Sequence, residues 1–517
     1  MTEQDRLIPI APATRNRRAL ILPGGGMRVA YQAGIVKALH DAGLRFSYAD
    51  GTSGGTMNLG ALLGGLTPDQ LCARWRTLKP TDFVSLRPLK AYAKFPAMGA
   101  MGDFDTIESR IFPHLGIDAA RIRESQGTFS TFNVCDFTDK IVSPIPHTEI
   151  VHEHLLAAIS LPLATPPVRY NRRFWTDAVW IRDSNLMAAV QAGGNELWVA
   201  WCIGNTPSFS DGLLQQYVHM IEMAAVGALN EELATIAEIN QRIARGENPY
   251  GHDQPITVHI IRPDIPIPLD PDYLTGKIDG KTLIAYGYRD ACRYLDNHYF
   301  DKLKAAGIEL SPEATKMRDP GEGVFFSEVM KGHLTFGETD PQKGSRHPAA
   351  IPVAMHGAID IRDIREFVRD PQHRAELNGF LEIHRLGGWM PAMWGEVCLF
   401  SPSHLPSLSY MAYDMKVVIG GERYFFKGRK HVKFAMPWKL WGATTTLYVT
   451  LHRGESDEGE IVAAGILRLG FTDLFSLAAT LQGKGVLSWR RRFAAVGRFV
   501  KFFTGQLVRI DILRRPA

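Results

Sequence analysis

The chain has 517 residues, of which 45% are hydrophobic and 22% charged, and its formal net charge is +4. This composition excludes a disordered or fibrous chain, and the small net charge argues against a general nucleic-acid-binding surface. A single core rarely grows beyond about 250–300 residues, so we expect two domains. The five cysteines are scattered and show no CxxC spacing, which predicts buried, reduced side chains.

The beginning of the chain gives no targeting signal. Residues 1–17 are polar and lack the apolar segment of a secretory signal, so we expect a flexible N-terminus in a cytoplasmic protein. No clean run of about 18 apolar residues is present, which argues against a membrane-spanning helix.

The first half of the chain alternates strand-like and helix-like segments. Residues 18–23 form a short apolar run that predicts a buried strand, and residues 29–42 have apolar side chains at helical spacing. This alternation is typical of an α/β domain, which we expect to span residues 18–310. The later elements predicted in it are strands over 46–50, 196–203 and 256–261 and helices over 56–65, 213–244 and 282–299.

The second half has a different sequence pattern. From Val324 on, short segments rich in Thr, Val, Tyr and Phe alternate with Gly- and Pro-marked turns, which is typical of an antiparallel β domain. We predict a linker over 311–323, a β-rich accessory domain over 324–485 and a basic amphipathic tail over 486–517. The tail holds eight Lys and Arg residues against one acid, Asp511.

The sequence Gly51-Thr52-Ser53-Gly54-Gly55 lies between a predicted strand and a predicted helix. A Gly-x-Ser-x-Gly turn holds its serine on a sharp, strained bend, where the hydroxyl is presented as a nucleophile. The positive end of the following helix places the Gly54 N–H near a developing oxyanion. Taken alone, the motif also fits a tight turn without chemistry.

A second glycine-rich loop, Gly24-Gly25-Gly26-Met27-Arg28, joins the first strand to the first helix. Consecutive glycines expose backbone N–H groups that can bind a phosphate or stabilise an oxyanion. A dinucleotide-binding loop requires Gly or Ala at the last position of its motif, where this chain has Val29. A nucleotide-dependent oxidoreductase is therefore the less favoured interpretation.

Together these blocks resemble the patatin-like phospholipases, over roughly residues 18–300. Leu20–Leu39 is similar to the oxyanion loop of that family, and Gly51–Gly55 to its nucleophile elbow. Ala158–Pro167 resembles the proline-marked segment before the catalytic Asp, and Phe174–Val179 resembles the Asp-Gly-Gly/Ala motif. The resemblance implies a three-layer α/β/α hydrolase domain with a mainly parallel sheet.

The resemblance also implies a lipid acyl hydrolase that cleaves carboxylic esters with a Ser–Asp dyad. Ser53 would be the nucleophile and Asp177 its general base, with a pKa raised by burial. Arg28 would hold the loop or an anionic head group. The glycines of the implied oxyanion hole are Gly24, which opens the loop, and Gly25, Gly26 and Gly54, which supply N–H groups.

Two positions depart from the family pattern. Val29 and Ala178 stand where members usually have glycine, which keeps open a catalytically impaired lipid-binding or scaffolding protein as an alternative. An acyltransferase using the same dyad is a further alternative. Asp183 competes with Asp177 for the role of base, and its other interpretation is a turn or helix-cap residue.

The resemblance implies no cofactor and no metal. His147, His152 and His154 cluster near a predicted exposed helix start, and we do not expect them to bind a metal ion. The β-rich region is similar to an accessory region fused to some bacterial lipid- and sterol-active enzymes, which identifies no catalytic residue.

The tail mixes aromatic and cationic residues from Trp489 to Phe503. This mixture predicts either peripheral contact with an anionic membrane or a terminal helix that docks on the β domain. The expected partners are therefore a lipid ester substrate and, through the tail, a membrane surface, with no nucleic acid.

Overall fold

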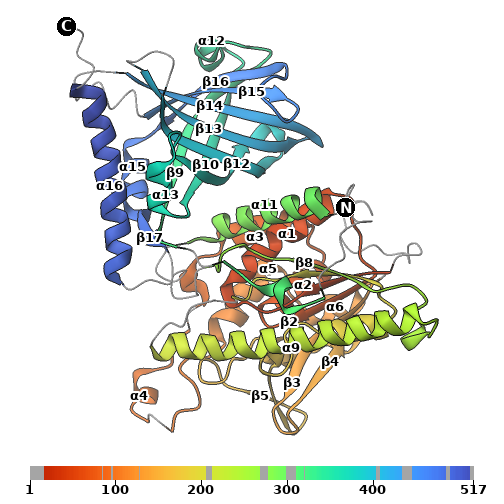
Figure 1. The fold of residues 1–517 in the computed structure, drawn as a ribbon. Coiled ribbons are helices and arrows are strands. Elements are labelled where there is room, and N and C mark those ends of the chain that lie inside the picture. The colour runs from red at the N-terminus through yellow and green to blue at the C-terminus, as the bar shows by residue number, and fades with distance from the viewer. Residues whose placement is uncertain are drawn as a thin grey trace. The chain divides into compact units, whose positions relative to one another are not determined.

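The computed structural model describes residues 17–83, 85–94, 97–126, 128–204, 212–267, 278–298, 310–318, 321–402, 408–433, 445–484 and 489–512. The chain divides into two compact units, Met1–Arg318 and Asp319–Ala517 (Figure 1). The predicted flexible segment 1–17 lies outside the described residues, apart from Arg17. Part of the predicted linker packs in the first unit, where Met317 is buried in the core.

The first unit is built on a mixed sheet with the strand order β5-β6-β3-β2-β1-β7-β8, and β4 pairs with β3. Strands β3, β2, β1, β7 and β8 run parallel, whereas β4, β5 and β6 join antiparallel. The strands are β1 (Arg18–Leu22), β2 (Tyr48–Thr52), β3 (Phe129–Asp136), β4 (Ile141–Pro146), β5 (Val168–Tyr170), β6 (Arg173–Asp177), β7 (Glu196–Ala200) and β8 (Thr257–Ile261).

Helices cover both faces of this sheet, so the predicted α/β/α layering is present. Figure 1 shows α1, α3 and α11 on one side and the long helix α9 on the other. The helices are α1 (Ala30–Asp41), α2 (Gly54–Leu63), α3 (Pro68–Thr77), α4 (Leu89–Tyr92), α5 (Phe112–Leu115), α6 (Ala119–Glu124), α7 (His152–Ala157), α8 (Leu186–Gln191), α9 (Leu213–Ala244) and α11 (Gly280–His298), with short 3-10 turns η2 (Gly26–Val29), η6 (Ala178–Trp180) and η8 (Pro312–Thr315) among them.

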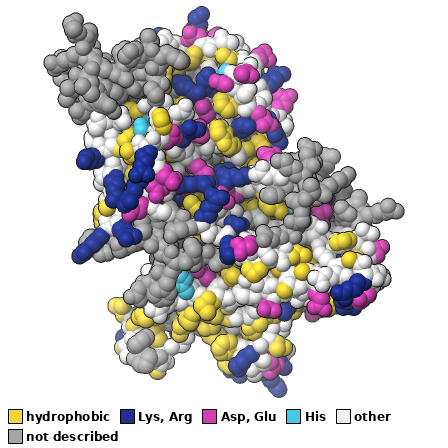
Figure 2. Space-filling view, in the orientation of Figure 1, with side chains coloured by type: hydrophobic (Ala, Val, Ile, Leu, Met, Phe, Trp, Pro, Cys, Tyr) yellow, Lys and Arg dark blue, Asp and Glu magenta, His cyan; other side chains and the backbone are white. Residues whose placement is uncertain are grey.

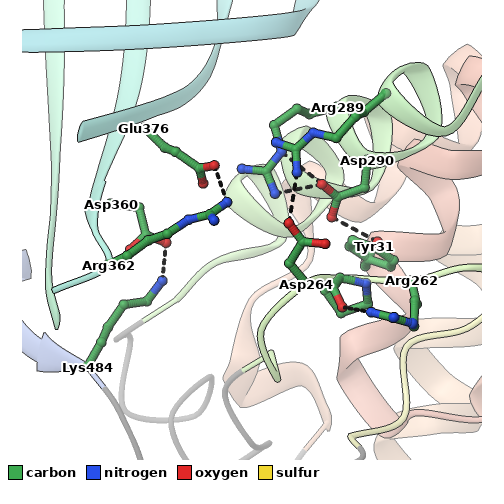
Figure 3. A network of polar contacts seen from close by, with 11 residues as sticks. Tyr31, Arg262, Asp264, Arg289, Asp290, Asp360, Arg362, Glu376 and Lys484 are labelled. Atoms are coloured by element: carbon green, nitrogen blue, oxygen red, sulfur yellow. Dashed lines mark hydrogen bonds and ion pairs between the residues drawn. The ribbon is translucent and has the colours of Figure 1, made fainter. Parts of the chain in front are cut away.

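The helices α1 and α11 cross closely because each has a glycine at the crossing. A Cβ atom on Gly34 would lie 2.1 Å from the Ile284 carbonyl oxygen, and one on Gly287 would lie 1.9 Å from the Tyr31 carbonyl oxygen. The Tyr31 hydroxyl donates a hydrogen bond to Asp290 Oδ2 at 2.9 Å (Figure 3). Backbone contact and a buried polar pair therefore fix the register of the two helices.

The second unit is a closed antiparallel barrel, in which β9 pairs with both β10 and β16, and β17 pairs with the start of β9. The strands are β9 (Gly323–Phe336), β10 (Ile351–Ile361), β11 (Arg374–Ile383), β12 (Gly388–Pro402), β13 (Leu408–Ile419), β14 (Glu422–Lys433), β15 (Thr446–Arg453), β16 (Ile461–Leu469) and β17 (Gln482–Lys484). Its helices are α12 (Pro341–Arg346), α13 (Ile364–Arg369), α15 (Phe471–Thr480) and α16 (Trp489–Ile512).

Charged groups pair within this unit. Lys430 Nζ lies 3.2 Å from Glu328 Oε2, both side chains are buried, and the ammonium also donates to the Tyr413 hydroxyl at 2.9 Å. In Figure 3, Lys484 of β17 pairs with Asp360 and Arg362 pairs with Glu376. The group of Lys430, Glu328 and Tyr413 lies inside the barrel core, where an unpaired charge would lower the free energy of unfolding.

The helix α16 packs on the barrel through its aromatic side chains. Phe499 is buried against Phe326 and Phe367, and Phe502 stacks edge-on against Phe367 and Phe400. The helix thus docks on the β domain, which is one of the two alternatives for the tail; membrane contact by its other face stays a prediction. Among the described residues, no helix has both the length and the apolarity needed to cross a bilayer.

The close helix crossing generates a test of the fold. We expect Gly287→Ala to lower the free energy of unfolding by about 1–3 kcal/mol, because its methyl group would collide with the α1 backbone. Gly227→Ala is the matched control, since a Cβ atom on this α9 glycine would meet no atom within 4 Å. The control should stabilise the chain slightly, as alanine does in an open helix position. Equal effects of the two substitutions in urea unfolding would contradict the proposed packing constraint.

Candidate active site

Ser53 lies on the turn between β2 and α2 with a strained backbone. Its φ is 51° and its ψ is −130°, a region that a non-glycine residue rarely adopts, and its side chain is almost fully buried. Flanking glycines make the turn sterically allowed. A Cβ atom on Gly55 would lie 1.9 Å from the Leu22 carbonyl oxygen, and one on Gly54 would lie 2.8 Å from the Gly26 carbonyl oxygen. The predicted helix over 56–65 therefore begins at Gly54, directly after the turn.

Asp177 ends β6 and is fully buried beside Ser53. Its Oδ1 accepts a hydrogen bond from the Val179 N–H at 2.9 Å, while Oδ2 is buried without a hydrogen-bond partner of regular geometry in the described structure. Burial raises the pKa of Asp177 to about 7, and the Ser53 hydroxyl and the Val179 N–H lower it in part. A carboxyl group with a pKa near 7 is well matched to accepting a proton at neutral pH.

The glycine loop has its peptide groups fixed one by one. The Gly24 carbonyl oxygen accepts a contact from Cys202 Sγ at 3.2 Å, and the Gly25 carbonyl oxygen accepts hydrogen bonds from Arg28 N at 3.1 Å and Arg28 Nε at 3.0 Å. In a trans peptide the next N–H points opposite to the carbonyl. These contacts therefore set the directions of the Gly25 and Gly26 N–H groups.

Gly24 itself brings the loop against Ser53. A Cβ atom on Gly24 would lie 2.7 Å from Ser53 Cβ and 3.1 Å from Ser53 Oγ. The Gly24 N–H donates to Asp183 Oδ1 at 2.8 Å, so in this structure it is not available to an oxyanion. The predicted role of Gly24 as the opening of the loop matches this position, whereas its N–H serves Asp183.

Asp183, the competing candidate for the base, also lies against Gly24. It is fully buried, and burial raises its pKa well above the ordinary value. The Gly24 N–H lowers this pKa, and the nearby Asp177 raises it further. Asp183 is thus neither a helix cap nor a simple turn residue: it anchors the glycine loop across 159 positions of sequence.

Arg28 and the two residues that depart from the family pattern, Val29 and Ala178, fit this geometry without backbone strain. Arg28 is buried, and its Nε holds the Gly25 carbonyl. Val29 has φ −64°, an ordinary helical value, so glycine is not required there. Ala178 begins the 3-10 turn η6 and is not among the non-glycine residues with positive φ. Both departures from the family pattern are therefore compatible with the arrangement of the site.

The sequence did not lead us to predict the buried polar side chains that bind the backbone on either side of the glycine loop. Asn58 Nδ2 donates to the Val29 carbonyl at 2.9 Å and to Gln32 Oε1 at 3.0 Å, and Trp75 Nε1 donates to Asn58 Oδ1 at 2.7 Å. Gln32 Nε2 continues the network to the Pro23 carbonyl at 2.6 Å. The available signal was an amide side chain, Gln32 or Asn58, within the largely apolar start of the helix that follows each glycine-rich turn.

A second buried network lies under the Asp177 side of the site. Asn133 Nδ2 donates to Asp50 Oδ1 at 2.6 Å and to Thr52 Oγ1 at 2.8 Å, and Asn185 Nδ2 donates to Asn133 Oδ1 at 3.0 Å. Burial raises the pKa of Asp50 to about 7. These contacts connect β2, β3 and the segment that follows Asp177.

The histidine cluster has structural partners. His154 is buried and meets the rings of Tyr170 and Trp175 edge-on, and His147 Nδ1 accepts from the Ser130 N–H at 3.3 Å. Across the described residues, no group of three or more His, Cys, Asp and Glu side chains is arranged to hold a metal ion.

The loop anchor generates a test that does not depend on chemistry. Asp183→Ala should lower the free energy of unfolding by about 1–3 kcal/mol, because the buried Gly24 N–H loses its acceptor. Asp183→Asn keeps an oxygen acceptor and removes a poorly compensated charge, so it should be at least as stable as the wild type at pH 8. Urea unfolding of both variants checks this, and an equal loss in both would show that the carboxylate charge is what matters.

Comparisons with known proteins agree with the first unit. Residues 20–190 match the family model described as Patatin-like phospholipase. Among solved structures, VipD from Legionella pneumophila is similar, with 12% identity over 57% of this chain and 72% of that chain and a TM-score of 0.26. A TM-score this low supports no conclusion about this chain. No curated protein matches the sequence. The mainly parallel sheet agrees with this match, which supports a patatin-like phospholipase domain over residues 20–190.

Proposed function

We propose that the chain hydrolyses carboxylic esters of lipids through a dyad of Ser53 and Asp177. At a coarse level, the family match supports a lipid acyl hydrolase. The observation that carries the proposal is the position of Ser53, on a strained turn between a buried carboxyl group with a pKa of about 7 and a loop whose N–H directions are fixed.

In the first half of the reaction, Ser53 Oγ attacks the acyl carbonyl carbon while Asp177 takes the hydroxyl proton. Negative charge moves to the carbonyl oxygen, and the N–H groups of Gly25, Gly26 and Gly54 stabilise it. The Gly54 N–H is available because it starts α2, where the first N–H groups have no partner within the helix. Asp177 then gives the proton to the departing alcohol oxygen, and an acyl-enzyme remains.

In the second half, Asp177 takes a proton from water, and the resulting hydroxide attacks the acyl-enzyme carbonyl. The fatty acid leaves, and the proton returns to Ser53 Oγ. A histidine is not needed, because burial already brings the carboxyl group into the neutral pH range. Before substrate binds, the network through Asn58 holds the glycine loop, and the network through Asn133 joins β2 to the segment that follows Asp177.

The nucleophile is tested by covalent labelling. A fluorophosphonate probe should label the wild-type chain, and Ser53→Ala should abolish the labelling while leaving the thermal unfolding temperature nearly unchanged. If the folded wild type resists the probe, the chain is better described as a lipid-binding or scaffolding protein. Release of a fatty acid rather than its transfer to an added alcohol distinguishes hydrolysis from acyl transfer.

The base is tested by a matched pair of substitutions. Asp177→Asn should lower kcat on a lipid ester by about 10²–10⁴-fold, the usual contribution of a general base. Asp183→Asn makes the same chemical change 6 positions along the chain and should reduce kcat far less. The reverse order of the two effects would assign the base to Asp183.

The pKa of Asp177 sets the expected pH dependence. Because the ionised form accepts the proton, kcat should fall about tenfold per pH unit below pH 7.

The folded-state pKa of Asp177 exceeds the ordinary value of 3.8, so the folded state binds this proton more tightly than the unfolded state does. The stability that the protonated form contributes is therefore lost as pH rises from about 4 to 7. The gain in thermal stability of Asp177→Asn over the wild type should accordingly be larger at pH 8 than at pH 5. An equal gain at both pH values would argue against a raised pKa.

A further inference from the structure

Exposed apolar side chains surround a loop that begins beside Asp177. The Ser160 carbonyl accepts from the Asp177 N–H at 2.9 Å, and Ser160 Oγ donates to the Pro166 carbonyl at 2.8 Å, which closes the loop. Leu163 lies at its tip and is 68% exposed. The loop therefore exposes a leucine three residues from Ser160, whose carbonyl bonds to the candidate base.

The backbone of Leu163 is strained. Its φ is +78°, a conformation that is unfavourable for a large side chain and that glycine adopts at little cost. A leucine at such a position would normally gain packing energy in return, but this side chain is exposed. Strain of this kind is concentrated at functional sites, which points to a role outside the isolated chain.

Further exposed apolar residues lie next to Leu163. The Met101 N–H donates to the Leu163 carbonyl at 2.8 Å, Gly102 forms a bridge with Leu86, and the Tyr92 hydroxyl of α4 donates to the Met101 carbonyl. On the other side, the Tyr217 hydroxyl of α9 donates to the Pro162 carbonyl at 2.7 Å. We define the apolar rim as six exposed apolar side chains on these segments: Leu86, Leu89, Met101, Leu163, Leu213 and Met220.

The apolar rim is continuous with the candidate active site. Tyr217, which lies between Leu213 and Met220 on α9, stacks edge-on against Trp180 of η6 and has its pKa raised to about 12 by burial and by Asp177. Figure 2 shows hydrophobic side chains gathered at the lower left of the view, over the region of α4 and beside α9. Contiguous exposed apolar surface of this kind marks an interaction site.

Cations accompany the apolar side chains. Between Ser85 and Met101 the sequence holds Arg87, Lys90 and Lys94 and no acid. Asp103 follows, but it accepts a hydrogen bond from the Ser85 hydroxyl within the same segment. Leucines flanked by lysines are the combination that inserts into the head-group region of an anionic bilayer.

We propose that the apolar rim docks the first unit on an anionic lipid bilayer, so that a lipid ester passes from the bilayer directly to Ser53. The choice of a lipid surface as the partner rests on the proposed function. Ser53 is only 6% exposed, and an apolar substrate must reach it without crossing water. The positive segment beside the rim favours anionic lipid over a neutral partner.

The test compares Leu86→Ser/Leu89→Ser/Leu163→Ser with the wild type on vesicles of phosphatidylcholine mixed with phosphatidylglycerol. Binding by cosedimentation should weaken at least about tenfold, and hydrolysis of vesicle lipid should fall in parallel. Leu386→Ser, which makes the same change at an exposed turn of the second unit, should bind as the wild type does. Unchanged binding of the triple variant would overturn the proposal. Vesicle binding would then be assigned to the tail, or the apolar rim to a protein partner.

Two further measurements separate this inference from the proposed function. The triple variant should hydrolyse a water-soluble short-chain ester at the wild-type rate, which also shows that it is folded. If the wild type binds vesicles through the rim but cleaves neither substrate, the proposed function fails while the docking surface stands. Lys90→Glu/Lys94→Glu should remove the preference for phosphatidylglycerol over phosphatidylcholine alone, and an unchanged preference would overturn the assignment of an anionic surface.

Discussion

The orientation of two peptide groups in the loop Gly24–Arg28 is the constraint on which the first unit depends. Arg28 and Cys202 hold the carbonyl oxygens, Asp183 holds the first N–H, and amides on α1 and α2 support the loop from beneath. Donors fixed in advance need no reorganisation when charge appears, which is why preorganised dipoles are effective in catalysis. The tight glycine contacts at Gly54 and Gly55 serve the same end, because they keep the turn that carries Ser53 in contact with the end of β1 and with this loop.

The arrangement is costly for folding. Asp50, Asp177, Asp183 and Glu232 are all buried in one domain, and burial raises the pKa of each. Partial compensation comes from backbone N–H groups and asparagines, from Arg28 beside Asp183, and from Arg182, whose Nε lies 3.6 Å from Glu232 Oε1. The proposed acid, Asp177, would thus lower stability in exchange for reactivity.

Local patterns were enough to predict the α/β domain, the β-rich region, the strand–helix turn at Ser53 and the strand before Asp177, because such junctions leave a signature within a few residues. The anchor from Asp183 to Gly24 could not be predicted, since its partners are far apart in sequence. Composition also could not decide whether the aromatic residues of the tail meet lipid or protein, as either environment is apolar. For the same reason, the leucines of the apolar rim could not be distinguished from core leucines before their exposure was known.

The docking of α16 on the barrel has a consequence for biosynthesis. All residues of the first unit have been translated once Arg318 has left the ribosome, so that unit can fold while the rest of the chain is still being made. The barrel core includes Phe499, which is supplied by the helix that follows the last strand. Its apolar strands therefore stay partly uncovered until translation has passed this residue, and exposed apolar surface of this kind is prone to aggregation.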